Sequence, residues 1–375
     1  MNSWIENYFE ALFIALLLTG LIIPKILLIA FRKKLFDGMD GRKIHRGAVP
    51  RLGGIAFMPA ILISVILGIG LNLRFSTGAM PATVGQTSVH MLFLICSLTL
   101  LFLVGIADDL IGVRYRAKFL FQIIGGVLVV ISGMWVSDLY GFLGIEQLPV
   151  WLGWALTVLL VVYVTNAINL IDGIDGLASG LSIIALVFYS YVLLATGRYL
   201  NAMICGAALG ALIPFFYFNV FGRSANHTKI FMGDTGSLTI GMILAYMSIV
   251  VTTISPTEIP GGENVIVLAL APIMLPCLDV IRVFMHRVKN GHNPFLPDKC
   301  HIHHKMLALG FVQWQALIVI LAADAVLVIV NLLVSPLIGS TWIILGDILL
   351  WTLANMGLTR LIRRREHKQG VILYE

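Results

Sequence analysis

Residues 151–195 read WLGWALTVLLVVYVTNAINLIDGIDGLASGLSIIALVFYSYVLLA and contain two apolar runs, 151–168 and 177–195, on either side of a short polar connection. A helix that crosses the hydrocarbon core of a bilayer needs about 20 mainly apolar residues, and each run comes close to that length. The connection, 169–176, carries two Asp-Gly pairs. The stretch therefore predicts two membrane-spanning helices joined by an acidic turn.

The same alternation of apolar runs and short polar connections extends along the chain. Of its 375 residues, 59% are hydrophobic and 12% are charged, and the mean hydropathy is +0.97, which excludes an ordinary soluble globule. We predict an all-α, polytopic integral membrane protein with about eleven spans, in which residues 1–375 form a single transmembrane catalytic domain. The predicted spans are 11–31, 53–71, 91–107, 119–136, 151–168, 177–195, 201–218, 237–254, 265–285, 316–333 and 342–362.

Charged residues predict the orientation. The first span lacks the basic flank of a cleaved signal peptide, because Glu6 and Glu10 precede it without any Lys or Arg. One set of alternate connections holds 22 of the 25 Lys and Arg residues, whereas the other holds only Arg74 and Arg198. Cytoplasmic loops carry such an excess, so we expect the N-terminus outside and the C-terminus in the cytoplasm. This bias explains the net charge without a nucleic-acid partner, and anionic membrane lipids suit the basic tail at 363–365.

Polar motifs recur on the face that is expected to be cytoplasmic. They are Asp108 and Asp109 after the third span, Asn166, Asn169, Asp172 and Asp175 at the end of the fifth, Asp234 before the eighth, and the stretch 297–304 before the tenth. Charged groups at membrane depth are costly and usually mark a functional site. Because the opposite loops carry only scattered acids, we expect one cytoplasmic active site assembled from several loops.

Carboxylates and amides on one face suit a divalent metal and phosphate groups. Mg²⁺ prefers oxygen ligands and typically binds one or two carboxylates together with substrate phosphates and waters. Phosphoryl transfer suits such a site, because its catalysis is mostly alignment and charge neutralisation. The alternative for Asp172 and Asp175 is that they cap a helix, a common role of Asp at helix starts. The adjoining Asn166 and Asn169 favour the functional interpretation.

The run that ends at His304 leaves three interpretations open. Zinc prefers Cys and His ligands, so Cys300, His301, His303 and His304 permit a zinc site, although their spacing fits no known finger. The others are a solvated loop and a set of contacts to a substrate phosphate or sugar, of which we favour the contacts. Lys118 is the best cationic candidate, because it begins the fourth span at the level of the lipid headgroups.

Three carboxylates lie deeper in the predicted spans. Asp279 follows Pro272 and Pro276, in a stretch where we expect a broken helix whose freed backbone lines a cavity or packs on protein. For Asp324 and Asp347 we expect hydrogen bonds between helices. No function is predicted for any of the three.

The motifs together resemble the polyprenyl-phosphate N-acetylhexosamine-1-phosphate transferases, of the glycosyltransferase 4 type. The resemblance runs from about Asp37 to Phe311. It rests on Asp37, His45 and Gly53-Gly54 in the first loop, Asp108-Asp109 with Lys118, the run Asn169 to Gly176, Phe231 to Ser237, and Leu278-Asp279 through Pro294 to His304. Ile302 interrupts the histidine run, as in the branch that uses UDP-GlcNAc with undecaprenyl phosphate.

This resemblance implies an activity. An N-acetylhexosamine 1-phosphate, with GlcNAc favoured, would pass from a UDP-N-acetylhexosamine to undecaprenyl phosphate and release UMP. The reaction would need Mg²⁺, with Mn²⁺ as an alternative ion. It would be the first membrane step of cell-envelope polysaccharide synthesis, at the bacterial inner (cytoplasmic) membrane. A homodimer is left open.

The resemblance also implies roles for single residues. Asp234 would hold Mg²⁺, with Asn169 as a second ligand. Asp108 and Asp109 would face the polyprenyl phosphate, supported by Lys118, and Asp172 and Asp175 would organise the nucleotide side. The expected substrate-binding residues are Lys118, Asn166, His45, His301, His303 and His304, of which the last three would contact the donor diphosphate.

The residues permit two mechanisms and two alternative functions. The acceptor phosphate is largely a dianion at neutral pH, since its second pKa is about 6, so direct attack on the donor β-phosphorus is favoured. A covalent intermediate on Asp108 or Asp109 is the alternative. An intramembrane aromatic prenyltransferase would leave Asp234 and the histidines unexplained. A transporter would be expected to place its charges near the bilayer midplane, often within repeated halves.

Overall fold

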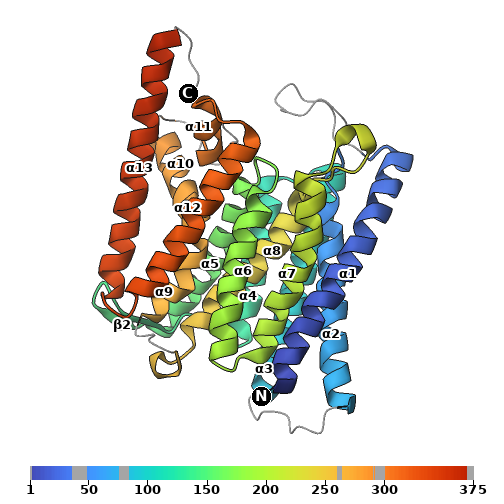
Figure 1. The fold of residues 1–375 in the computed structure, drawn as a ribbon. Helices are drawn as coiled ribbons and strands as arrows, with labels where there is room; N and C mark the ends of the chain where they lie inside the picture. The colour runs from blue at the N-terminus through green and yellow to red at the C-terminus, as the bar shows by residue number, and fades with distance from the viewer. Residues whose placement is uncertain are drawn as a thin grey trace.

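The structure is a computed structural model that describes residues 2–35, 49–75, 84–259, 264–289, 291 and 300–369, and it is predominantly helical (Figure 1). The helices are α1 (Asn2–Lys33), α2 (Phe57–Phe75), α3 (Val84–Ile111), α4 (Tyr115–Ile131), α5 (Val150–Ile171), α6 (Leu177–Ala195), α7 (Tyr199–Val220), α8 (Gly233–Thr252), α9 (Val265–Leu270), α10 (Met274–Lys289), α11 (Ile302–Ala308), α12 (Gln313–Val334) and α13 (Ser340–Gln369). A 3₁₀ turn, η1 (Gly53–Ala56), leads into α2.

The predicted membrane spans correspond to these helices. Within the described ranges, ten helical segments are long and apolar enough to cross a membrane, and α9 and α10 together make one of them. The 17-residue α4 runs beside them in the same bundle (Figure 1) and accounts for the remaining predicted span. The start of α1 and the end of α13 lie at opposite ends of the bundle, as an odd number of crossings requires. The chain is therefore an all-α, multi-pass membrane protein.

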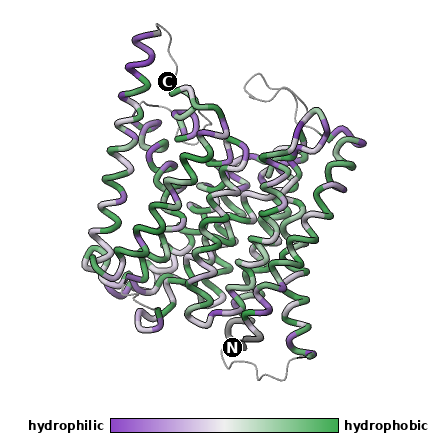
Figure 2. Tube along the Cα trace, in the orientation of Figure 1, coloured by the Kyte–Doolittle hydropathy of each residue, from purple (hydrophilic) through white to green (hydrophobic). Residues whose placement is uncertain are grey.

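Hydropathy follows the same arrangement. Hydrophobic residues fill the middle of the bundle and hydrophilic residues gather toward its two ends (Figure 2). Helix α8 lies at the centre, where every residue from Thr235 to Thr252 is buried. Small residues allow neighbouring backbones to approach it closely, because a Cβ on Gly105 would collide with Thr235 and a Cβ on Gly54 would collide with Gly236.

The broken helix that the prolines predict is present. A 3₁₀ turn, η4 (Ala271–Ile273), separates α9 from α10 and contains Pro272. The carbonyl of Ala269, next to the break, accepts hydrogen bonds from the Tyr189 hydroxyl at 2.8 Å and the Ser248 hydroxyl at 2.8 Å. Protein side chains thus satisfy a backbone group that an apolar surrounding would otherwise leave unpaired.

A β-hairpin was not predicted. Strands β1 (Asp138–Phe142) and β2 (Ile145–Gln147) form an antiparallel hairpin between α4 and α5. Its turn contains Gly144 and Leu143 with positive φ, and the Tyr140 hydroxyl donates to the Thr252 carbonyl at 2.9 Å. The short polar connection gave too weak a signal, because a strand of three to five residues shows little alternation.

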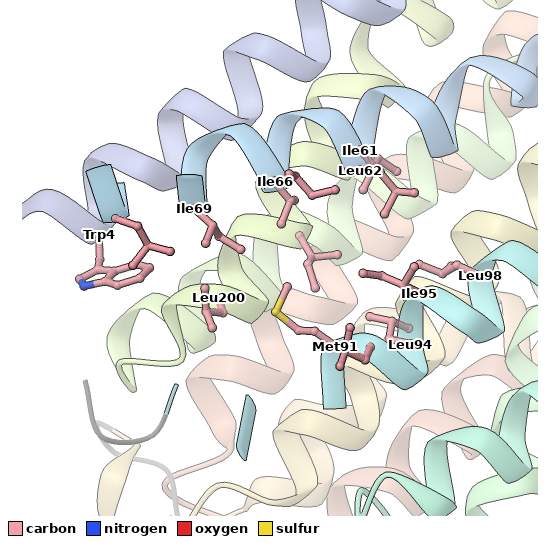
Figure 3. Close-up of a pocket in the computed structure, with 14 residues that line it drawn as sticks. Trp4, Ile61, Leu62, Ile66, Ile69, Met91, Leu94, Ile95, Leu98 and Leu200 are labelled. Atoms are coloured by element: carbon pink, nitrogen blue, oxygen red, sulfur yellow. The ribbon is translucent and has the colours of Figure 1, made fainter. Parts of the chain in front are cut away.

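A cavity of about 300 Å³ opens among α1, α2, α3 and α7 (Figure 3). Its lining is apolar and includes Trp4, Ile66, Met91 and Leu200. Trp4, Met91 and Leu200 lie toward the starts of α1, α3 and α7, whereas Ile66 lies in the middle of α2. The lining contains none of the candidate site residues.

Candidate active site

The site is built around the first turn of α8. Gly233 has a φ of +73°, and a Cβ there would lie 2.5 Å from Asp109 Oδ2, so the position requires glycine. Asp109, in the last turn of α3, accepts hydrogen bonds from the amides of Asp234 at 2.8 Å and Thr235 at 2.9 Å. The Thr235 hydroxyl donates a third, at 2.5 Å. Asp109 therefore caps α8 from another helix, because first-turn amides have no partner within their own helix.

The segment before α2 fixes the same turn from a second side. Phe231 donates its amide to the Pro50 carbonyl at 2.9 Å, and Gly53 donates its amide to the Phe231 carbonyl at 3.0 Å. The Gly54 amide donates to the Met232 carbonyl at 2.9 Å. The glycine pair noticed in the sequence thus holds the approach to α8.

Lys118, in the first turn of α4, joins two of the predicted carboxylates. Its ammonium donates to Asp108 Oδ2 at 2.9 Å and to Asp234 Oδ2 at 2.5 Å. Only 22% of the Lys118 side chain, 14% of Asp108 and 22% of Asp234 are exposed, and partial exclusion of water strengthens such pairs. The structure therefore brings together three predicted site residues that come from three helices.

The two asparagines of the fifth span have different neighbours. Asn166 donates to Gln122 Oε1 on α4 at 2.6 Å and ties α5 to that helix. Asn169 donates to the Ser237 hydroxyl on α8 at 2.8 Å, one turn after Asp234. Because this bond uses the amide nitrogen, the oxygen of Asn169 is the atom that could bind a cation.

Neither aspartate of the turn between α5 and α6 is the N-cap residue of α6, and Asp172 is the C-cap residue of α5. The N-cap of α6 is Gly176, which has a φ of +80°. The Gly176 amide donates to Asn219 Oδ1 of α7 at 2.6 Å. Asp175 instead pairs with Lys229 at 2.5 Å. The expectation that an aspartate caps the start of a helix is therefore contradicted at the N-cap of α6, which is Gly176 and neither Asp172 nor Asp175.

Asp172 directly follows α5 and is open to water on one side while protein surrounds it on the others. This partial loss of hydration raises its pKa to about 7, and the carboxylates of Asp175 and Asp234 add to the rise while Arg51 opposes it. The group is thus only partly ionised at neutral pH. An anionic ligand can approach it at a lower electrostatic cost than it could approach a full carboxylate.

Asp279 on α10 anchors the loop that carries the histidines. Its Oδ2 lies 2.8 Å from His301 Nδ1, and its Oδ1 accepts a hydrogen bond from Arg282 at 2.8 Å. The Ile302 amide also donates to Oδ1, at 3.2 Å. A carboxylate without a predicted function therefore sets the position of α11. His301 is itself buried in this contact.

His303 reaches the acidic turn. Its ring packs so closely on Gly173 that a Cβ there would collide with Nε2. The ring is 1% exposed, and neither nitrogen has a hydrogen-bond partner among the described residues. It lies parallel to the His301 ring at 5.9 Å and 4.2 Å from the His304 ring. Burial, reinforced by the neighbouring histidines, lowers the pKa of His303 to about 3, so the ring is neutral at physiological pH.

These donors fit Mg²⁺ better than zinc. Asp108 and Asp234 already direct oxygens at one cation, the Lys118 ammonium, and Mg²⁺ typically needs only one or two carboxylates beside waters and phosphates. In the part of the chain that the structure describes, no three His, Cys, Asp or Glu side chains cluster so as to hold a metal ion. His301 Nδ1 is already paired with Asp279. The described residues thus offer no zinc centre at the histidines.

Of the remaining predictions, some fall outside the described residues, one is confirmed and one is wrong. Asp37, His45 and the loop 292–299 lie outside the described residues. Asp347 accepts a hydrogen bond from Asn331 at 2.8 Å, which confirms the expected contact between helices. The same expectation is wrong for Asp324, since neither of its carboxylate oxygens has a partner among the described side chains and backbone groups.

Several polar residues at the site were not predicted. They are Arg51, Gln122, Asn219, Lys229 and Ser237. Lys229 had a signal, because only one other cation occurs in the connection between α7 and α8. Gln122 and Asn219 are buried polar residues inside apolar helices, a pattern that the membrane cost of such groups makes informative.

The chain is similar in sequence to known proteins. A family model described as glycosyl transferase family 4 matches residues 91–252, the stretch from α3 to the end of α8. The chain is 32% identical over 307 residues to an undecaprenyl-phosphate alpha-N-acetylglucosaminyl 1-phosphate transferase of Salmonella typhi, covering 80% of this chain and 76% of the relative. A probable undecaprenyl-phosphate N-acetylglucosaminyl 1-phosphate transferase of Bacillus subtilis is 32% identical over 311 residues, covering 82% and 80%. An enzyme of Escherichia coli strain K12 with the same name as the Salmonella protein is 31% identical, covering 81% and 78%.

Proposed function

The chain belongs to glycosyl transferase family 4, and from this premise we propose that it transfers N-acetylglucosamine 1-phosphate from UDP-N-acetylglucosamine to undecaprenyl phosphate and releases UMP. The relatives' names support the transferred group and the acceptor. Family membership removes the aromatic prenyltransferase and the transporter as alternatives. The observation that carries the proposal is that Asp108, Lys118 and Asp234 contact one another where α3 ends and where α4 and α8 begin.

Lys118 is the group that we assign to the acceptor. Its ammonium lies at the start of α4, at the boundary where the phosphate of a membrane-embedded lipid would lie. A phosphate dianion can replace one of the two carboxylates that now bind this ammonium, because both partners carry negative charge and oxygen acceptors. Asp108 would then remain beside the acceptor and help to orient it.

Asp234 and Asn169 would hold Mg²⁺. Asp234 lies in the first turn of α8. Asn169, near the end of α5, contacts the same part of α8 through its hydrogen bond to Ser237. When bound, the ion would neutralise the donor diphosphate, as divalent ions do in other phosphoryl transfers. The donor set is composed of oxygens, which supports Mg²⁺, or Mn²⁺ in its place, over zinc.

The turn at 172–176 and α11 form the side that we assign to the donor. Asp172 and Asp175 face this side, and Lys229 balances the charge of Asp175. His303 presents a neutral ring against Gly173, and neither of its nitrogens has a partner among the described residues, although buried polar groups normally have one. A sugar or phosphate oxygen of the donor would supply one.

Direct displacement is the step that these contacts favour. Three hydrogen bonds from α8 occupy the Asp109 carboxylate, so it is poorly placed to act as a nucleophile. The acceptor phosphate needs no general base, because it is largely a dianion at neutral pH. One inversion at the transferred phosphorus is expected, and net retention would contradict direct displacement.

The cellular setting rests on charge. The site lies at the end of the bundle where Lys and Arg concentrate, and this excess supports a cytoplasmic active site at the bacterial inner membrane. A homodimer remains a prediction. The first membrane step of cell-envelope polysaccharide synthesis is the role that fits such a product.

A donor and acceptor panel tests the proposal. Detergent-purified protein is incubated with Mg²⁺, undecaprenyl phosphate and radiolabelled UDP-GlcNAc or UDP-GalNAc, and lipid-linked label and released nucleotide are measured. Label in the lipid from UDP-GlcNAc, with equimolar UMP, is expected. Transfer from UDP-GalNAc alone would overturn the assigned sugar, and transfer from neither donor to undecaprenyl phosphate would overturn the function.

A further inference from the structure

Helix α11, which carries the histidines, is held at three points along its length. Asp279 of α10 binds His301 at its start. At its middle, the Lys305 ammonium donates to Thr359 Oγ1 at 3.0 Å and to Asn355 Oδ1 at 3.2 Å, both on α13. At its end, Arg365 of α13 donates to the Ala308 carbonyl at 3.3 Å. Two of the three attachments therefore come from α13.

Helix α13 is otherwise exposed on much of its surface and lies at the edge of the bundle (Figure 1). Asn355 is nevertheless only 5% exposed, on a helix that is apolar enough to span the membrane. A buried amide at that depth is costly unless it has a partner. The Lys305 side chain, 4% exposed, supplies it. A buried polar contact thus joins α13 to α11.

We propose that Lys305 is a positioning residue for the donor: by binding Asn355 and Thr359 it fixes the rotation of α11 that keeps His303 on the Asp172–Asp175 turn. The inference rests on the proposed function, and it assigns α13 a role in positioning the helix that contacts the UDP-sugar. Because Lys305 and His303 lie on one short helix, turning α11 to release the first would also lift the second from Gly173.

The charge of Lys305 gives the proposal a pH signature. Burial and, to a smaller extent, the nearby Arg282 guanidinium together lower its pKa to about 8, against the opposing effects of Asp279 and Cys300. The groups of α13 that bind the ammonium, Asn355 and Thr359, do not titrate. The contact is therefore complete below about pH 8 and weakens as the pH rises through that value.

Binding of UDP-GlcNAc to the full-length protein, measured by calorimetry with Mg²⁺ present, tests the proposal together with the Michaelis constants for both substrates. Lys305→Met keeps the apolar stem and removes the charge. It should weaken donor binding and raise the donor Michaelis constant about tenfold, which is the loss expected when His303 no longer makes one hydrogen bond to the charged donor. The Michaelis constant for undecaprenyl phosphate should stay unchanged. Thr352→Val is the matched control, because the Thr352 hydroxyl donates to its own helix at Ile348.

Lys305→Arg separates positioning from simple stability. A guanidinium stays charged above pH 8, so this variant should retain donor binding and lose the alkaline decline that the wild type shows. An unchanged donor affinity in a folded Lys305→Met protein would overturn the inference. So would equal changes in both Michaelis constants, or an alkaline decline that persists in Lys305→Arg.

The proposal and the proposed function can fail separately. If the wild type binds UDP-GlcNAc but makes no lipid product, the function falls and the binding comparison still judges Lys305. If the wild type makes product and Lys305→Met binds the donor normally, only the positioning role falls. If the wild type does not bind UDP-GlcNAc at all, both are overturned.

Discussion

The ammonium of Lys118 lies 2.5 Å from a carboxylate oxygen of Asp234, although 116 residues separate the two in the sequence. The contact joins the start of α4 to the first turn of α8, and Asp108 shares the same ammonium at 2.9 Å. One cation thus holds the carboxylate assigned to the metal next to the carboxylate assigned to the acceptor. The predictions that follow separate these groups from their structural neighbours.

The adjacent aspartates should behave differently when they are changed. Asp109→Asn replaces an acceptor of three α8 hydrogen bonds with a group that can also donate, so stability should fall by about 1 kcal/mol, as for a lost helix cap, together with activity. Asp108→Asn should impair steps that involve undecaprenyl phosphate more than donor binding, at little cost in stability. Thermal unfolding in detergent and separate Michaelis constants measure both. Equal loss of stability in the two variants would contradict the division.

Lys118→Met should weaken the acceptor interaction. The ammonium is the cation assigned to the lipid phosphate, and losing a charged hydrogen bond costs about tenfold or more in apparent affinity. Lys118→Arg should retain part of the binding, because the charge remains while the geometry changes. Steady-state rates at varied undecaprenyl phosphate provide the measurement. A change confined to the donor Michaelis constant would reverse the assignment.

Acid should destabilise the protein through His303. Its pKa is about 3 in the folded protein, whereas an unfolded histidine titrates near 6.5, so the unfolded state binds more protons between these values. The neutral ring therefore contributes fully above about pH 6.5, and stability declines as the pH falls below it, by about 2 kcal/mol at pH 5. His303→Asn should reduce this decline, whereas His227→Asn, at an exposed position, should not. Thermal unfolding scans between pH 5 and 7.5 measure how stability depends on pH in the wild type and the two variants. The same dependence in all three proteins would contradict a buried neutral His303 ring.

The close approach at Gly54 should tolerate no side chain. A Cβ at Gly54 would collide with the backbone of Gly236, so Gly54→Ala should cost about 1–3 kcal/mol and reduce activity by shifting the first turn of α8. Gly70→Ala is the control within α2, because no atom of the described residues lies within 4 Å of a Cβ at that position. Thermal stability in detergent compares the two. A destabilised Gly70→Ala with an unaffected Gly54→Ala would contradict this packing.

Much of the fold could be predicted, because lipid imposes one simple requirement. A span needs a long apolar run, and 177–195 coincides with α6 to the residue. Boundaries were less accurate where polar residues continue a helix. The eighth span was expected to begin at 237, yet α8 begins at Gly233 and contains Asp234, because Asp109 supplies the missing cap from α3. Such a cap depends on a contact across the bundle, which no local pattern records.

The candidate site was predictable in composition but not in pairing. The acidic motifs identified which residues come together, because charged groups at membrane depth are costly and usually belong to a functional site. They could not reveal that Asp279 binds His301 or that Lys229 binds Asp175, because these pairs join separate loops. Nor could they separate the roles of Asp108 and Asp109, which are adjacent in sequence and point to different partners.

The central claim is that the donor's β-phosphorus moves with the sugar. UDP-GlcNAc labelled with ³²P at the β-position, incubated with the purified protein, Mg²⁺ and undecaprenyl phosphate, tests it directly. The account predicts that the label enters the lipid product, that the released UMP is unlabelled, and that Asp234→Asn abolishes both products while the protein stays folded. Label retained in released UDP would show transfer of the sugar alone, and that result would contradict the account.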